Sequence, residues 1–456
     1  MSGPTVSHVG GTPNLLLGQF DIASIGYTAT EFFVSGTATG VTGTAPYATR
    51  IVVLTPEDTA RFDGTVVVEW LNVSGGIDAP ALWFMAHREI VRAGHAYVAV
   101  SAQSVGVVGG GASLGMDMSL KKLDPQRYST LSHPGDGFAY DIYSQVGRVI
   151  RDRPDELLGT LRPEAVVAVG ESQSAMFMTT YVNAVDPVAK VYDGFLVHSR
   201  FGPAAPLDGS SIFDELATEG GEPAPFAAEL RVPVVTVITE TDLVGGGIRA
   251  GYYLARQPET DLLRAWEIPG TAHADNYTVN VGFIDSGLAP LADLVAAYEP
   301  TSTLMGRELP HCINFGPQHH YVLQAALAHL VRWARGGEAA PSAQRLELTD
   351  AEPPALVLDE NGIATGGVRT PWVDVPVART SGVGDAEDVM TLLFGSGEVF
   401  DAQTLDRLYP GGASDYLTRF TASLDLAIGS GFVLAADRQE ILDLAAATWP
   451  GQPQFN

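Results

Sequence analysis

Short apolar runs alternate with amphipathic stretches through the first three quarters of the chain. The runs show little polar alternation, which is typical of strands that are buried on both faces. Helical spacing of apolar residues separates several of them, and the links are short. This order predicts an α/β fold with a mostly parallel sheet covered by helices. The predicted strands are at 64–71, 96–100, 166–169, 192–197, 232–238 and 263–268, and the main helices at 79–93, 136–151, 173–184, 288–298 and 321–334.

Other stretches add a hairpin, an insertion and a C-terminal extension to this predicted fold. An opening antiparallel hairpin is predicted from 28–41 and 48–54, and a helix at 248–255. The glycine-, proline- and alanine-rich segment 203–230 reads as an insertion or as a loop over the site. After residue 338 proline punctuates the chain. We therefore predict a core at 1–340 and, at 341–456, an extension packed against it. Its predicted extended pieces are at 356–358 and 372–377, and its helices at 404–408, 416–429 and 438–447.

Composition narrows the class of protein. The chain has 456 residues, of which 46% are hydrophobic and 17% charged, so a large folded core is expected. A net charge of −27 leaves no basic stripe for nucleic acid or an anionic membrane. Neither a signal-peptide pattern nor a membrane-spanning run is evident, so we expect a cytoplasmic protein, unless a leader was trimmed from this sequence. Cys312 is the single cysteine, which excludes an intrachain disulfide. The oligomeric state is not indicated.

The stretch 166–177 carries the strongest chemical signal. It reads as a buried strand, a sharp turn and a helix, with Ser172 at the turn in a G-x-S-x-S frame. A serine held at such a turn presents its hydroxyl at the carboxyl edge of the sheet. Gly170 leaves room for the tight backbone, and Ser174 stands where the fuller pattern has glycine. An ordinary strand–helix turn is the alternative interpretation.

A serine nucleophile needs a base, an acid and N–H donors for the oxyanion. Two carboxylates, Glu240 and Asp242, directly follow the predicted strand 232–238. Asp242 has the spacing expected of the acid, and Glu240 is the alternative. His273 follows the last predicted strand through a glycine-containing turn, which favours it as the base. Serine, acid and histidine thus arrive in this order at the ends of strands.

Further candidates surround this set. The backbone N–H of Gln173 is the first expected oxyanion donor, and that of Val73 or Ser74, in the loop after the strand 64–71, is the second. Asn72 is expected to orient that loop and to face the substrate. His319 and His320, placed before a predicted helix, are candidate pocket residues. They lack a third ligand for a metal, and we expect neither a metal nor a cofactor.

With these residues in view, the sequence resembles the α/β-hydrolase superfamily, and more closely a branch of bacterial "α/β hydrolase domain" proteins of similar length. The order of the motifs carries the resemblance, and it implies a serine hydrolase with a Ser–His–acid triad and esterase-like chemistry, but no particular substrate. The G-x-S-x-S frame departs from the family pattern at Ser174. The resembling segments are 69–72, 127–128, 133–136, 140–142, 170–174, 240–242, 270–275 and 366–371.

The leading hypothesis is a serine hydrolase that cleaves carboxylic esters of small molecules through an acyl-enzyme. The same triad could transfer the acyl group to an alcohol or amine, and a non-catalytic binding protein on this fold is the third possibility. The loop 203–230 and the region after 340 are expected to form the walls of the pocket. A dehalogenase or epoxide hydrolase is disfavoured, because those reactions on this fold need a carboxylate where Ser172 stands.

Overall fold

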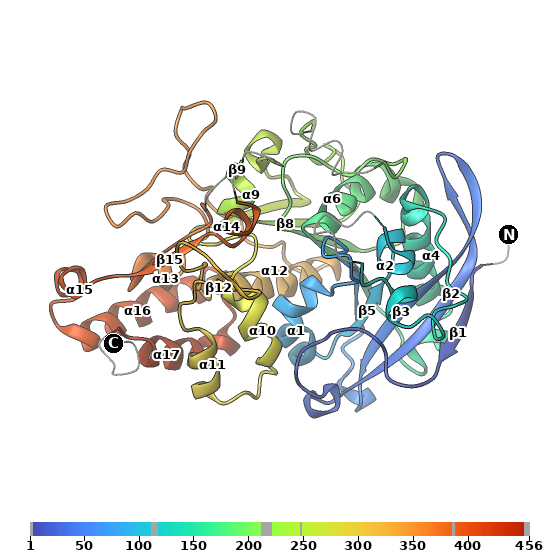
Figure 1. The fold of residues 1–456 in the computed structure, drawn as a ribbon, viewed down its shortest axis with the longest axis horizontal. Coiled ribbons are helices and arrows are strands. Elements are labelled where there is room, and N and C mark those ends of the chain that lie inside the picture. The colour runs from blue at the N-terminus through green and yellow to red at the C-terminus, as the bar shows by residue number, and fades with distance from the viewer. Residues whose placement is uncertain (1–2, 111–116, 211–220, 247–248, 385–387, 451–456) are drawn as a thin grey trace.

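A nine-stranded sheet forms the centre of the molecule in the computed structural model, which describes residues 3–110, 117–210, 221–246, 249–384 and 388–450. Six neighbouring strands are parallel, and an antiparallel hairpin with one further strand extends the sheet at one edge (Figure 1). The prediction of a mostly parallel sheet is thus confirmed. In spatial order the strands are β1 (Thr5–Val9), β2 (Tyr27–Gly40), β3 (Gly43–Pro56), β5 (Ala96–Val100), β4 (Thr65–Trp70), β6 (Ala165–Glu171), β7 (Gly194–His198), β8 (Val234–Thr239) and β11 (Leu263–Ile268).

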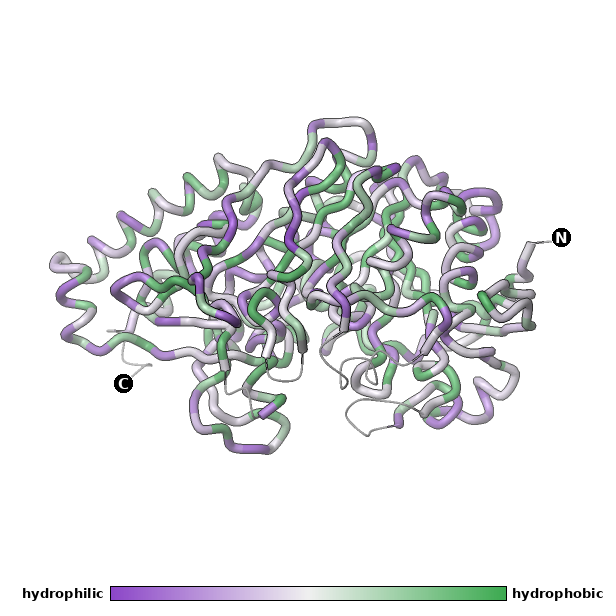
Figure 2. The backbone as a smooth tube through the Cα atoms, turned by 90° about the horizontal axis from the view of Figure 1, so that it is seen from above, coloured by the Kyte–Doolittle hydropathy of each residue, from purple (hydrophilic) through white to green (hydrophobic). Residues whose placement is uncertain are grey.

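Helices cover both faces of this sheet. Alternate residues of one strand enter different cores, as β4 illustrates: Val66 and Val68 pack with the helices of one face, and Val67 packs with those of the other. Both faces are therefore apolar, which explains the unbroken hydrophobic runs in the sequence. In Figure 2, where each residue is coloured by its hydropathy, green hydrophobic stretches run through the middle of the molecule. The first face carries α4 (Ala139–Asp152) and α6 (Gln173–Thr180), and the second carries α1 (Ala81–Ala93) and α12 (Gln318–Ala334).

The residues after 340 share the core of the second face. Phe420, Leu424 and Ile441 belong to the same hydrophobic cluster as α1 and α12. The indole N–H of Trp266 in β11 donates to the carbonyl of Pro341 at 2.8 Å. These C-terminal helices lie at one end of the long axis, and the N-terminal hairpin lies at the other (Figure 1). The boundary near residue 340 stays a prediction. The C-terminal elements are α13 (Pro371–Asp374), β14 (Ala378–Ser381), α14 (Val389–Phe394), β15 (Ser396–Val399), α15 (Ala402–Leu408), α16 (Gly412–Gly429) and α17 (Arg438–Ala447).

Several local predictions were wrong. The predicted helix 248–255 is a two-residue strand and a 3-10 turn in its described part, and the extended piece 372–377 overlaps the short helix α13. The described parts of the segment 203–230 hold no helix or strand, and residues 211–220 lie outside the described residues. The remaining short elements are α2 (Ser104–Val108), α3 (Leu120–Leu123), α5 (Asp155–Leu158), α7 (Asp186–Ala189), α9 (Glu240–Val244), β9 (Gly245–Gly246), β10 (Arg249–Ala250), α10 (Gly282–Ile284), α11 (Leu291–Ala297), β12 (Thr303–Leu304) and β13 (Arg307–Glu308).

Candidate active site

Ser172 lies at the sharp turn between β6 and α6. Its φ is 57° and its ψ is −117°, a conformation that non-glycine residues rarely adopt and that costs about 1–3 kcal/mol. The turn is tight, because a Cβ atom on Gly170 would lie 2.9 Å from the carbonyl oxygen of Ser174. The N–H of Ser172 donates to the carbonyl of His198 in β7 at 2.9 Å. These contacts hold the Ser172 side chain at the carboxyl edge of the sheet, where it lines a cavity.

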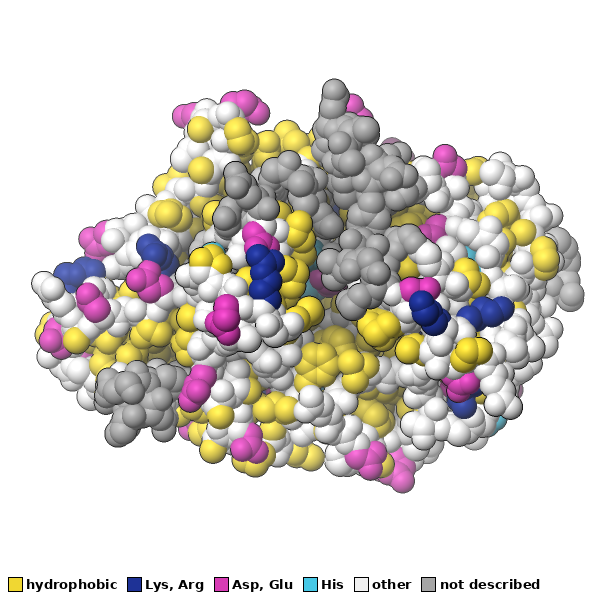
Figure 3. Space-filling model, viewed as in Figure 1, with side chains coloured by type: hydrophobic (Ala, Val, Ile, Leu, Met, Phe, Trp, Pro, Cys, Tyr) yellow, Lys and Arg dark blue, Asp and Glu magenta, His cyan; other side chains and the backbone are white. Residues whose placement is uncertain are grey.

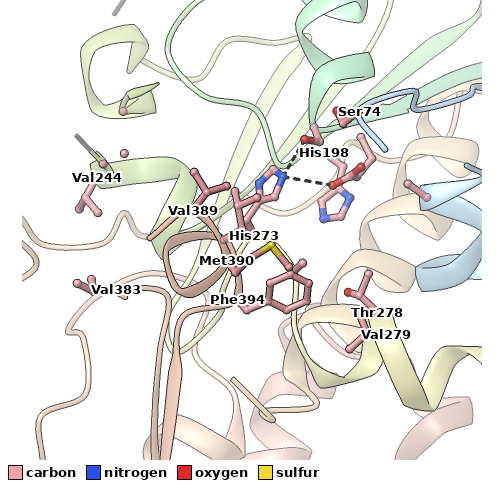
Figure 4. A pocket seen from close by; sticks show the side chains of 18 of the residues that line it. Ser74, His198, Val244, His273, Thr278, Val279, Val383, Val389, Met390 and Phe394 are labelled. Carbon is pink, nitrogen blue, oxygen red and sulfur yellow. Dashed lines mark hydrogen bonds and ion pairs between the residues drawn. The ribbon is translucent and has the colours of Figure 1, made fainter. Parts of the chain in front are cut away.

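His273 and Asp242 reach the same place from two other strand ends. Ser172 Oγ lies 2.7 Å from His273 Nε2, and His273 Nδ1 lies 2.6 Å from Asp242 Oδ1. Asp242 is fully buried in the first turn of α9, where its other oxygen accepts from the N–H and hydroxyl of Thr239 at 3.0 and 2.7 Å. With Nδ1–H donating to the carboxylate, Nε2 is left to accept the serine proton. Figure 4 shows His273 at the cavity, with dashed contacts to neighbouring side chains.

The carboxylate of Glu240 accepts hydrogen bonds from groups other than the His273 imidazole. Its Oε1 accepts from the N–H of Gly270 at 2.5 Å, and its Oε2 accepts from the N–H of Gly382 and the hydroxyl of Ser381 at 2.7 and 3.0 Å. Burial raises the pKa of Glu240 to about 7. Of the two candidate acids, Asp242 therefore contacts the imidazole, and Glu240 links the turn after β11 to a loop of the C-terminal region.

The loop after β4 lies against the start of α6. The N–H of Val73 donates to Gln173 Oε1 at 3.3 Å, and the N–H of Ser74 donates to Asn72 Oδ1 at 2.8 Å. Asn72 Nδ2 in turn donates to the Glu171 side chain at 3.1 Å. The Asn72 amide thus links the loop to the end of β6. Asn72 and Ser74 line the cavity together with Ser172.

Glu171 and His198 also line the cavity, and the sequence analysis missed both. Glu171 Oε1 lies 3.8 Å from His273 Nε2. Burial raises the pKa of Glu171 to about 7. Burial also lowers the pKa of His198 well below its ordinary value. Both are polar residues at the carboxyl ends of predicted strands, the same signal that singled out Asp242.

His319 and His320 lie behind the cavity wall. The structure starts α12 at Gln318, so both are inside the helix rather than before it, as the sequence analysis had them. His319 Nε2 contacts His198 Nε2 at 2.8 Å, and its Nδ1 contacts Asp275 Oδ2 at 3.3 Å. The ring of His320 stacks on Tyr277 with centroids 3.7 Å apart. Neither is among the lining residues, so substrate contact by either one stays a prediction.

The cavity has a volume of about 1550 Å³. Among its lining residues are several from the C-terminal region, such as Leu356 and Met390. None comes from the described parts of the loop 203–230, which was expected to form a wall. Within the described ranges, no group of three or more His, Cys, Asp or Glu residues is arranged to hold a metal ion. None of the helices in the described part of the chain has the length and apolarity needed to cross a membrane.

Known structures with a similar fold are distant. An α/β serine hydrolase without a lid from Xanthomonas campestris is 15% identical, covers 53% of this chain and 85% of its own, and has a TM-score of 0.31. An esterase from Pyrococcus furiosus is 10% identical, with 59% and 87% coverage and a TM-score of 0.29. A cold-adapted esterase from an Arctic intertidal metagenomic library is 12% identical, with 53% and 84% coverage and a TM-score of 0.31.

The family assignment comes from sequence. A search of curated proteins finds no match to this chain. The family described as "Alpha/beta hydrolase domain" matches residues 1–443, which is nearly the whole chain. This match agrees with the parallel sheet and with the turn between β6 and α6, and it confirms the predicted α/β-hydrolase fold. The chain therefore belongs to the alpha/beta hydrolase domain family.

Proposed function

We propose that this protein is a serine hydrolase that cleaves carboxylic esters of small molecules through an acyl-enzyme. The observation that carries the proposal is the unbroken chain of short contacts from Ser172 Oγ through His273 to Asp242, at 2.7 and 2.6 Å, at the wall of a large cavity. Serine, imidazole and carboxylate in this arrangement are what nucleophilic acyl transfer requires. A non-catalytic protein has no need to hold Ser172 in a strained backbone conformation beside an imidazole.

In the first half of the reaction Ser172 Oγ attacks the ester carbonyl carbon while His273 Nε2 takes the hydroxyl proton. The carboxylate of Asp242 stabilises the imidazolium that forms. The carbon–oxygen bond to the alcohol then breaks, and the alcohol leaves with the proton from Nε2. In the second half water attacks the acyl-enzyme, again losing a proton to Nε2, and the acid leaves as Ser172 regains its proton.

The oxyanion needs two N–H donors. We assign them to the backbone of Gln173, in the first turn of α6, and of Val73. The Val73 N–H now donates to the side chain of Gln173 at 3.3 Å, a long bond that a substrate oxygen can replace. Of the two candidates for the second donor, Ser74 lines the cavity, but its N–H makes a shorter bond of 2.8 Å within its own loop.

The test uses a fluorophosphonate probe and p-nitrophenyl butyrate. We expect the probe to label Ser172, and Ser172→Ala to lower kcat by about three orders of magnitude or more, since the nucleophile is lost. Ser174→Ala is the matched control, because Ser174 is a fully buried serine that lies two residues after Ser172. Full turnover by Ser172→Ala, or labelling of another residue, would refute the proposal.

A further inference from the structure

The cavity beside Ser172 is larger than a short ester needs. Its volume is about 1550 Å³, whereas sites for drug-sized ligands commonly have about 300–1,000 Å³. Ser172, Glu171 and His198 lie together on its wall. A short acyl group on Ser172 would leave most of the space to water. A substrate with an extended acyl or alcohol part gains binding free energy by displacing that water from apolar surface.

Apolar side chains from separate parts of the chain line this space. One group comes from α1 and the segment before α11, with Phe84, Met85 and Phe283. Another comes from α14, with Val389, Met390 and Phe394, and Figure 4 shows Met390 and Phe394 next to His273. Figure 3 shows yellow, hydrophobic side chains gathered across the middle of this face of the molecule. A wall of this kind binds hydrocarbon and offers few hydrogen bonds to a polar substituent.

In the described part of the wall, the lysine, arginine and carboxylate side chains reduce to one acidic residue. Among the described lining residues Glu171 is the only carboxylate, and none is lysine or arginine. Arg307 follows the lining residues Leu304 and Met305 in sequence but does not line the cavity. Its guanidinium pairs instead with the carboxylate of Asp388. A carboxylate on the substrate would therefore lose hydration near Glu171 without gaining a cationic partner. The net charge of −27 adds long-range repulsion.

We propose that the site selects uncharged esters with a bulky apolar part and discriminates against esters that carry a carboxylate. This inference rests on the proposed esterase function and specifies its substrate class. The apolar wall supplies the affinity, and the carboxylate of Glu171 supplies the selectivity. The residues after 340 thereby contribute to substrate binding, because α14 forms part of the apolar wall.

The inference is tested first on the wild-type protein with three esters. They are p-nitrophenyl acetate, p-nitrophenyl octanoate and the p-nitrophenyl monoester of suberic acid, which matches the octanoate in chain length and ends in a carboxylate. We expect kcat/KM for the octanoate to exceed that for the acetate by at least about tenfold, since its additional methylenes are buried against the apolar wall. We expect the carboxylate ester to fall at least about tenfold below the octanoate.

Two variants test whether Glu171 and the apolar wall cause the discrimination against the carboxylate ester. Glu171→Gln removes the charge, and Met390→Lys adds a cation to the wall, so each should raise the ratio of kcat/KM for the carboxylate ester to that for the octanoate by at least about threefold. Leu426→Lys is the matched control for charge, because Leu426 is 72% exposed on α16 and does not line the cavity. If Leu426→Lys changed this kcat/KM ratio equally, the net charge of the protein rather than the cavity wall would cause the discrimination, and the inference would be overturned.

The outcomes separate this inference from the function on which it rests. If none of the esters is hydrolysed, or if Ser172→Ala hydrolyses them, the esterase proposal fails. If hydrolysis depends on Ser172 but the carboxylate ester or the acetate equals the octanoate, the esterase proposal stands and the substrate class is wrong. The wild-type comparison alone decides this, so a variant that fails to fold does not remove the test.

Discussion

Asp242 and Glu240 are two buried carboxylates on the same turn of α9, and their hydrogen-bond partners give them different tasks. Asp242 faces an imidazole that changes charge during the proposed reaction. Glu240 faces three fixed donors, two from the backbone and one from a hydroxyl. A carboxylate that accepts from three donors satisfies groups that would otherwise be buried without partners. We therefore expect Asp242 to act on turnover and Glu240 to act on stability.

Paired amide substitutions test this division. Asp242→Asn should lower kcat by about three to four orders of magnitude, because the amide no longer holds the imidazole in the required tautomer. Glu240→Gln places an NH₂ group against a backbone N–H, so the free energy of unfolding should fall by about 1–3 kcal/mol while kcat of the folded protein changes less than about tenfold. Ester kinetics and urea unfolding measure the two effects. The reverse pattern would assign the acid to Glu240.

The ionisation of Glu171 should affect how kcat/KM for ester hydrolysis depends on pH. Burial raises its pKa to about 7, so its carboxylate forms above that pH, 3.8 Å from His273 Nε2. A negative charge there stabilises the protonated imidazole, which cannot accept the serine proton. Removing this charge in Glu171→Gln should therefore move the rising limb of the kcat/KM profile to lower pH, by about one unit.

The profile is measured with a neutral ester, so that the charge of the substrate does not vary. Glu360→Gln is the control, because the Glu360 side chain is 78% exposed and does not line the cavity. An unchanged limb in Glu171→Gln, or a shift to higher pH, would mean that Glu171 does not act on His273.

At the scale of elements, the parallel sheet brings the candidate residues together. β6, β8 and β11 run in the same direction, so the residues that follow them meet at one edge. Ser172 and His273 follow the first and the last of these strands, and Asp242 lies in the first turn of the helix after β8. The cross-strand bond from the Ser172 N–H to the His198 carbonyl fixes the turn relative to β7. Residues about 30 and 100 positions apart thereby reach contact distance.

At the scale of the whole molecule, the C-terminal helices and the sheet share one core. Phe420 of α16 is fully buried and packs edge-on against Trp372, whose ring stacks on Tyr321 of α12. Arg88 and Arg92 of α1 pair with Glu440 and Asp437 near the start of α17. Because these contacts cross residue 340, we expect the two regions to unfold together.

Phe420→Ala tests this coupling. Losing a buried phenyl ring should lower the free energy of unfolding by about 3–5 kcal/mol. Fluorophosphonate labelling of Ser172 should be lost in the same urea transition as the helical signal. Leu426→Ala, on the same helix but at an exposed position, should change stability by less than about 0.5 kcal/mol. A first transition that leaves labelling intact would instead show an independently folding C-terminal domain.

The pattern of apolar and polar residues was enough to predict the six parallel strands, the turn at Ser172 and the order in which Ser172, Asp242 and His273 follow them. Strands buried on both faces leave unbroken apolar runs, and polar residues at their carboxyl ends stand out. The choice between Asp242 and Glu240 in contacting His273 came only from the tertiary structure, since two carboxylates on one turn differ in direction rather than in sequence signal. The region after 340 was expected to form part of the pocket wall, but only the tertiary structure showed that α14 does so, because a local pattern does not show which distant surface a short helix covers.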